Sequence, residues 1–208
     1  QKLQLEISRI LTIASFTLNY HFGGLDPYGY HLVNFLLHLC CAGLIFFLAR
    51  IVFREALGEE NPWLPFCAAL LFAVHPINTE VAAYASHRSE SLATLFYLAS
   101  LLCFIRAVKG SALFYILSLA SCLLAFFSKE IAVTLPLMIL IYDYIFLSDF
   151  DAKETLKRKF YHIPYWILLA GLLIFRFKYL SGIKDYEETI GDIWSRPAYL
   201  ATQFWVIC

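Results

Sequence analysis

One apolar run decides the fold of this chain: Tyr30-His-Leu-Val-Asn-Phe-Leu-Leu-His-Leu-Cys-Cys-Ala-Gly-Leu-Ile-Phe-Phe-Leu-Ala-Arg-Ile-Val-Phe53. A helix of about 20 apolar residues crosses the roughly 30 Å hydrocarbon layer of a bilayer. Tyr28 and Tyr30 lie at the beginning of the run. Arg50 and Arg54 lie at its end. Because aromatic and basic side chains are typical of the boundaries of a membrane span, the run predicts a transmembrane helix.

Similar apolar runs recur along the sequence and predict an all-α fold, a polytopic membrane helix bundle. We expect six full spans and a seventh that the sequence truncates. Asn61 followed by proline is a favourable start for the second of these helices. The expected spans are residues 30–53, 61–74, 91–105, 112–127, 131–147 and 163–180, with the seventh from Trp194 onward.

The composition supports this class. Of the 208 residues, 61% are hydrophobic and 15% are charged. A soluble domain of this length cannot bury so much apolar surface. The formal net charge is zero, so nucleic acid is not an expected partner, whereas the lipid bilayer is. Most of the six cysteines lie in apolar runs without Cys-x-x-Cys spacing, and we expect them to act as small apolar side chains.

The chain divides into two parts at the first span. Residues 1–29 predict an amphipathic, interfacial helix over 1–22 and a turn at Gly23-Gly-Leu-Asp-Pro27, which together form the end of an outer loop. Residues 30–208 form the transmembrane bundle. Because the sequence lacks an initial Met and stops within an expected helix, we expect a fragment of a longer protein.

Basic residues between the spans predict the orientation, because the cytoplasmic side of a membrane protein carries their excess. Within residues 28–165 one side carries Arg50, Arg54, Arg106, Lys109, Lys153, Lys157, Arg158 and Lys159, and the other carries Arg88 and Lys129. Counting both ends of the chain makes the two sides equal, but those ends are incomplete. We therefore predict that the first side is cytoplasmic and that residues 75–90 and 128–130 share the extracytoplasmic face.

A polar segment with two histidines, an arginine and two glutamates lies between the second and third spans, over residues 75–90. Asn78 is the expected N-cap of a short helix through Ser86. Such a helix brings Glu80 and His87 roughly onto one face. The segment has two readings: helix caps with an interfacial ion pair, or a pocket for an anionic head group in which Arg88 is a phosphate-binding fork.

A metal site is a third reading of the same segment. His75, Glu80 and His87 are all residue types that bind divalent cations, although their spacing is generic. No cofactor is therefore predicted with certainty, and a divalent cation remains an option.

Lys129-Glu130 interrupts two apolar runs with almost no loop. The pair can be a capped turn at the interface. Alternatively, Lys129 reaches a lipid phosphate while Glu130 holds it in place. Both readings stay open at this point.

Two further polar features lie inside expected spans. Asp143 lies late in the fifth, near the cytoplasmic side, and we favour a structural pairing with a basic residue of 153–159. His31, Asn34 and His38 share one face of the first span, where interhelical hydrogen bonding is more plausible than metal binding.

Several motifs, in order, resemble the membrane region of the TMTC proteins and their bacterial relatives. They are Leu18-Asn-Tyr20, Gly24-Leu-Asp-Pro-Tyr-Gly-Tyr-His-Leu-Val-Asn34, His75-Pro-Ile-Asn-Thr-Glu80, Ser86-His-Arg-Ser-Glu90 and Ser128-Lys-Glu-Ile-Ala-Val-Thr-Leu-Pro136. The resemblance covers about residues 10–145. It implies a GT-C type glycosyltransferase, in an endoplasmic reticulum or bacterial inner membrane, with tetratricopeptide repeats after the membrane part.

The resemblance also implies the substrates: a polyprenyl-phosphate sugar donor, typically dolichyl-phosphate mannose, and Ser or Thr hydroxyls of an acceptor protein. On this basis the candidate catalytic carboxylates are Glu90 and Glu80. The candidate residues for the lipid phosphate are Arg88, Lys129, Glu130, His75 and His87. The principal catalytic carboxylates of such enzymes fall in the first outer loop, so we expect them upstream and expect the fragment alone to be inactive.

Two other functions stay open from sequence. In a non-enzymatic membrane scaffold the same motifs would serve packing. In a lipid or solute transporter the same cations would bind a phosphate that moves without chemistry, but an internal repeat with matched broken helices would then be expected.

Overall fold

The computed structural model describes residues 9–58, 61–84 and 87–180, and every regular element in these ranges is a helix. This confirms the all-α class. In chain order the elements are α2 (Ile10–Gly23), α3 (Pro27–Leu57), α4 (Trp63–Val74), α5 (Pro76–Ala83), α6 (Arg88–Val108), α7 (Ala112–Phe126), the 3-10 helix η2 (Glu130–Thr134), α8 (Leu135–Tyr142), the π-helical η3 (Asp143–Leu147), α9 (Ala152–Lys157) and α10 (Lys159–Leu180).

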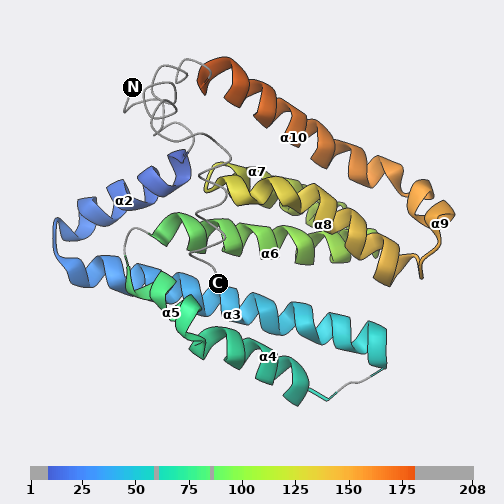
Figure 1. Ribbon diagram of the computed structural model, residues 1–208, viewed down its shortest axis with the longest axis horizontal. Helices are drawn as coiled ribbons and strands as arrows, with labels where there is room; N and C mark the ends of the chain where they lie inside the picture. The colour runs from blue at the N-terminus through green and yellow to red at the C-terminus, as the bar shows by residue number, and fades with distance from the viewer. Residues whose placement is uncertain (1–8, 59–60, 85–86, 181–208) are drawn as a thin grey trace, which may run out of the picture.

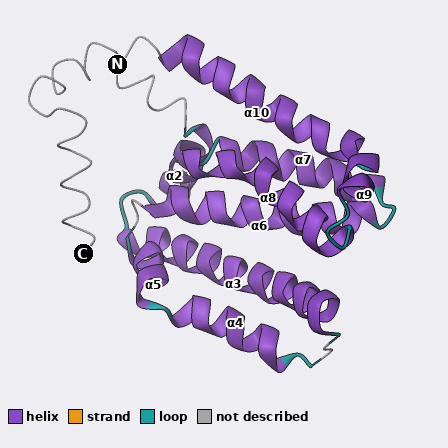
Figure 2. Cartoon of the chain, turned by 45° about the vertical axis from the view of Figure 1, so that its right-hand side comes forward, coloured by secondary structure: helices purple, strands orange, loops and turns teal. Residues whose placement is uncertain are grey.

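The long helices run side by side in alternating directions, so the connections gather at two opposite ends of the bundle (Figure 1). One end holds α2, α5, the first turn of α6 and the connection from α7 to η2; we call it the site end. The other end holds α9, the end of α3, the start of α4 and the connection from α6 to α7; we call it the α9 end. Figure 2 shows the same two ends from a second direction. Residues 75–84 and 87–90 therefore lie at the same end as 128–130.

Within the described residues, three helices are long and apolar enough to cross a membrane: Pro27–Leu57, Arg88–Val108 and the continuous Glu130–Leu147. Shorter apolar helices at Trp63–Val74, Ala112–Phe126 and Lys159–Phe175 run beside them. These findings confirm a membrane helix bundle. The number of six spans stays a prediction, and the expected seventh lies outside the described residues.

The outer surface of the bundle is apolar where a bilayer would surround it. Leu71, Ile116 and Ile167 are 67%, 63% and 64% exposed. In water such a surface would favour aggregation, but hydrocarbon solvates it. The buried core lies between α6, α7, α8 and α10, where Phe104 and Tyr165 are almost fully buried.

The local chemistry of the chain sets the helix boundaries. Asp26 caps α3 by accepting the backbone N–H of Tyr28 at 3.1 Å. The second apolar helix begins one residue later than predicted, because its N-cap is Pro62 and its first residue is Trp63. The side chain of Asn61 still accepts the N–H of Trp63 at 3.0 Å.

The cap predicted for the short helix was wrong. Its N-cap is His75, whose Nδ1 accepts the N–H of Ile77 at 3.3 Å, and the helix ends at Ala83. Pro76 explains the difference, because its fixed φ favours the first helical position and starts the helix before Asn78. Asn78 instead donates from Nδ2 to the carbonyl of Phe72 at 3.0 Å.

Buried hydroxyl groups join three helices in the core. Ser118 of α7 donates to the carbonyl of Ser100 in α6 at 2.6 Å, and Ser100 donates to the carbonyl of Ser118 at 2.8 Å. Tyr165 of α10 donates to Ser118 Oγ at 2.7 Å. Small polar residues let membrane helices approach closely and satisfy one another. On α3, Asn34 and His38 are buried and bond to the carbonyls of Tyr84 and Ala73, which confirms the interhelical hydrogen bonding predicted for these two residues. His31, the third residue of that prediction, is exposed.

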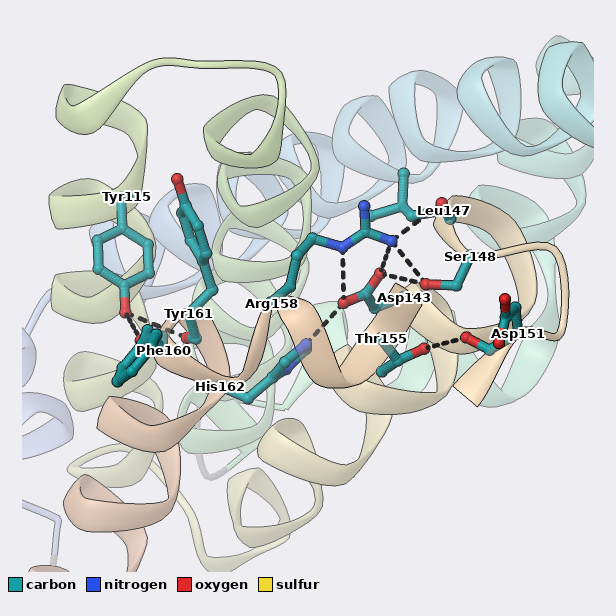
Figure 3. A network of polar contacts seen from close by, with 10 residues as sticks. All are labelled: Tyr115, Asp143, Leu147, Ser148, Asp151, Thr155, Arg158, Phe160, Tyr161 and His162. Atoms are coloured by element: carbon teal, nitrogen blue, oxygen red, sulfur yellow. Dashed lines mark hydrogen bonds and ion pairs between the residues drawn. The ribbon is translucent and has the colours of Figure 1, made fainter. Parts of the chain in front are cut away.

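A closed ionic network completes the α9 end (Figure 3). Asp143 is fully buried, with Arg158 Nη2 2.8 Å from Oδ1 and His162 Nε2 2.6 Å from Oδ2. Arg158 also donates to Ser148 Oγ at 2.6 Å and to the carbonyl of Leu147 at 3.0 Å. The predicted structural pairing of Asp143 with a basic residue of 153–159 is confirmed.

Replacing Asp143 tests this network. Asp143→Asn keeps the shape but leaves the Arg158 cation without its carboxylate, so we expect a loss of about 3 kcal/mol in the free energy of unfolding. Asp149→Asn is the matched control: Asp149 is exposed, has a φ of 46°, and Asn tolerates that conformation. Unfolding in mixed micelles checks both variants, and equal stabilities would contradict the assignment.

Candidate functional site

Three ionisable side chains meet at the site end, two from the start of α6 and one from the connection that follows α7. Lys129 Nζ lies 2.5 Å from Glu90 Oε1, and His87 Nδ1 lies 3.2 Å from the same oxygen. We call this set the Lys129–Glu90–His87 cluster. Glu90 therefore bridges a cation from the α7–η2 connection and a histidine from the start of α6.

The backbone explains how these residues reach one another. Glu90 lies in the first turn of α6, where the positive end of the helix dipole favours a carboxylate. Lys129 follows the end of α7 in an extended conformation, with φ −157° and ψ 152°. Successive side chains of an extended segment point to opposite sides. The side chain of Lys129 reaches Glu90 of α6, while that of Glu130, the first residue of η2, reaches Arg9.

Glu130 has a different ionic partner from the expected one. Its Oε2 lies 3.7 Å from Arg9 Nη2, at the start of α2. The ion pair of Lys129 is with Glu90, which comes from a separate helix. The residue that holds Lys129 is thus 39 positions away in sequence.

The cluster is ordered but remains accessible. The side chains of Lys129, Glu90 and His87 are 27%, 35% and 40% exposed. An ion pair at this degree of exposure contributes roughly 1 kcal/mol or less. An anionic ligand can therefore replace Glu90 as the partner of Lys129 at modest cost.

His75 and Glu80 lie at the same end on α5, and both are exposed. His75 is engaged as the cap of α5. Among the described residues no group of three His, Cys, Asp or Glu side chains is arranged to hold a metal ion. His75, Glu80 and His87 therefore do not assemble into the metal site considered from sequence.

Arg88 is fully buried, whereas His87 and Glu90 of the cluster are partly exposed. Arg88 donates from Nε to Asn34 Oδ1 at 2.8 Å, from Nη2 to Asn19 Oδ1 at 3.1 Å and to the carbonyl of Tyr30 at 3.0 Å, and from Nη1 to the carbonyl of Ser15 at 3.4 Å. Its guanidinium also lies 4.4 Å from the ring centre of Phe16. The fork expected to bind phosphate is thus directed into the chain, toward α2 and α3.

Sequence reasoning missed the α2 side of this arrangement. Asn19 was noticed only as part of a motif, and Arg9 and Phe16 were not singled out. A partial signal existed, because Ser15 and Asn19 are four residues apart and share one face of the helix.

Two grooves of the described residues lie away from this cluster, at the α9 end. One, of about 390 Å³, is bounded by Gly110, Tyr115 and Phe160. The other, of about 410 Å³, is lined mainly by apolar side chains such as Leu140, Ile163 and Trp166. Neither groove contains a residue of the cluster. We therefore locate the candidate site by the ionisable side chains of the cluster and not by the volume of a groove.

Comparison with known proteins places this geometry in a family. Residues 21–177 match the family described as dolichyl-phosphate-mannose-protein mannosyltransferase. The chain is 38% identical to human protein O-mannosyl-transferase TMTC2 over 188 residues, which cover 86% of the chain and 21% of that relative. Human TMTC4 is 30% identical over 72% of the chain and 22% of its own length. Drosophila melanogaster Tmtc3 is 34% identical over 65% of the chain and 17% of its own length.

The chain thus spans about a fifth of the length of these relatives. No solved structure matches it significantly. The matched region contains the Lys129–Glu90–His87 cluster, Arg88 and the Asp143 network. The chain belongs to the dolichyl-phosphate-mannose-protein mannosyltransferase family and is TMTC-like within it.

Proposed function

We propose that this chain is part of a membrane glycosyltransferase that moves a sugar, mannose, from a polyprenyl-phosphate donor to Ser or Thr hydroxyls of a protein. The observation that carries the proposal is the partly exposed Lys129–Glu90–His87 cluster at one end of a membrane bundle of this family. The relatives are named protein O-mannosyl-transferases. The site end is the extracytoplasmic end in this proposal, because the short connections at the α9 end carry most of the basic residues.

Lys129 is the residue best suited to the lipid phosphate. Its ammonium lies at an end of the bundle, where the phosphate of a lipid embedded in the bilayer would also lie. Its present partner, Glu90, occupies the place that a phosphate oxygen would take. His87 can donate a second hydrogen bond when its ring is protonated. A cation fixed beside the departing phosphate stabilises the charge that develops in the transition state.

The reaction also needs a base. The acceptor hydroxyl oxygen attacks the anomeric carbon of the sugar, the bond from that carbon to the phosphate oxygen breaks, and the lipid phosphate leaves with the bonding electrons. The hydroxyl proton passes to a carboxylate. Glu90 becomes available when Lys129 turns to the phosphate, and Glu80 is a second exposed carboxylate at this end. An endoplasmic reticulum or bacterial inner membrane would supply the lipid donor and the acceptor.

The first test removes the proposed phosphate cation. In the full-length protein in proteoliposomes, Lys129→Met should lower mannosyl transfer from a polyprenyl-phosphate donor by about 100-fold, because one charge-stabilising donor is lost. Lys129→Arg should retain more activity, since it keeps the charge.

Lys109→Met is the matched control. Lys109 forms a comparable ion pair with Glu55, 3.2 Å long, at the α9 end, so its replacement should leave transfer unchanged. Equal losses in the two Met variants would contradict the assignment. Donor binding without any transfer by the unmodified protein would instead support a transporter.

The second test frees Lys129 from Glu90. In Glu90→Gln the phosphate no longer competes with a carboxylate for Lys129, so KM for the donor should fall about fivefold. This change is equivalent to roughly 1 kcal/mol, the contribution of a partly exposed ion pair. Because Glu90 is also a candidate base, kcat should fall as well. Steady-state kinetics separate the effect on KM from the effect on kcat. A raised KM with unchanged kcat would contradict the proposal that Lys129 exchanges Glu90 for the phosphate.

A further inference from the structure

Helix α2 has few apolar contacts to hold it on the bundle. Thr12 is the only residue of α2 that the structure buries. Large apolar side chains of the helix, such as Leu18 and Phe22, are 60% and 81% exposed. The position of α2 must therefore depend on polar contacts to the rest of the chain or on the membrane interface.

Arg88 supplies those polar contacts. On the α2 side it reaches the carbonyl of Ser15, the amide oxygen of Asn19 and the ring face of Phe16. On the α3 side it reaches the amide oxygen of Asn34 and the carbonyl of Tyr30. One guanidinium thus joins α2, α3 and α6. Among the described residues its acceptors are neutral oxygens, and none of them is a carboxylate.

The hairpin between α2 and α3 is built to present these acceptors. Gly24 has a φ of 58°, which side-chain-bearing residues rarely adopt, and its carbonyl accepts the hydroxyl of Tyr30 at 2.9 Å. At Gly29 a Cβ atom would lie 3.0 Å from Asn19 Nδ2. The absence of a side chain at Gly29 therefore lets Asn19 sit close to α3, with its oxygen directed at Arg88.

The same helix extends to the cluster. Arg9, at the start of α2, lies 3.7 Å from Glu130, which is adjacent to Lys129 in sequence. Asn34 also donates to the carbonyl of Tyr84 at 3.1 Å, and the same carbonyl accepts the backbone N–H of His87 at 3.1 Å. Movement of α2 or of Asn34 would therefore reach both sides of the cluster.

We propose that Arg88 is a positioning residue that fixes α2 across the site end, so that the Lys129–Glu90–His87 cluster keeps the geometry needed for transfer. In this role Arg88 acts through Asn19 and Asn34 and does not itself bind the phosphate. The proposal rests on the proposed function for its effect on transfer, while the docking of α2 can be measured without it.

The experiment uses Arg88→Lys, Arg88→Ala and Asn19→Ala in the full-length protein. Lysine keeps the positive charge but cannot form the planar fork. We expect Arg88→Lys to lose as much kcat/KM as Arg88→Ala, at least tenfold, and Asn19→Ala to lose several-fold. Combining Asn19→Ala with Arg88→Lys should add little, because both remove the same contact. A phosphate-binding Arg88 would instead leave Arg88→Lys largely active and Asn19→Ala without effect.

A chemical readout reports the docking of α2 directly. Thr12 is buried, and among the described residues its hydroxyl has no hydrogen-bond partner, so Thr12→Cys removes no hydrogen bond to them. A polar thiol reagent should label Cys at position 12 about tenfold faster in the Arg88 and Asn19 variants than in the parent. Native Cys122, fully buried in the core, should stay protected and show that the bundle is intact.

These readouts separate the two proposals. Faster labelling without any detectable transfer in the parent protein would overturn the proposed function and keep the role of Arg88 in docking α2. Unchanged labelling in all variants would overturn the positioning role. Labelling of Cys122 in the Arg88 variants would show that these variants disrupt the bundle, and the test would then rest on the milder Asn19→Ala. If Asn19→Ala changed neither the labelling rate nor the kinetics, the proposal would be overturned.

Discussion

A buried guanidinium, that of Arg88, holds the site end together, and its partners in the described part of the chain are neutral oxygens. Removing a charge from water is costly unless hydrogen bonds replace the lost hydration. Arg88 meets this requirement with four oxygen acceptors from α2 and α3 and with the ring of Phe16. Each acceptor has to be in place for the cation to be tolerated. The interaction therefore specifies one arrangement of α2, α3 and α6.

The two ends of the bundle use charge in different ways. At the α9 end, Asp143 is fully buried and surrounded by Arg158, His162 and Ser148. Such a network is closed and has a structural role. At the site end, Lys129 and Glu90 are about a third exposed and can change partners. A site that receives an anionic lipid needs an accessible ion pair such as Lys129–Glu90. That pair also needs support from a framework as rigid as the buried Asp143 network.

Local patterns predicted most of the fold. The apolar runs located the helices, and Asn61 with Pro62 marked the start of α4 to within one residue, because these signals depend on neighbouring residues. The short helix was misplaced because proline after His75 outweighed the cap expected at Asn78. The pairing of Asp143 with a basic residue of 153–159 was also predicted, since a buried carboxylate requires a partner and the next connection supplied one.

The site was predicted only in part. The sequence identified Lys129, Glu90 and His87 as candidates and indicated that they share one end of the bundle. It could not show that Lys129 pairs with Glu90, because residues 39 positions apart meet only through the packing of α6 and α7. The burial of Arg88 was equally hidden, because its acceptors come from Ser15, Asn19, Tyr30 and Asn34, far away in the sequence.

The docking of α2 by Arg88 is the central claim, and a distance measurement tests it most directly. Spin labels at Leu18 of α2 and Ile131 of η2, which are 60% and 64% exposed, report on the two elements in a background without other reactive cysteines. Pulsed electron paramagnetic resonance on the full-length protein in nanodiscs should give one narrow distance distribution, which Arg88→Lys broadens. A broad distribution in the parent protein, or a narrow one that Arg88→Lys leaves unchanged, would contradict the account.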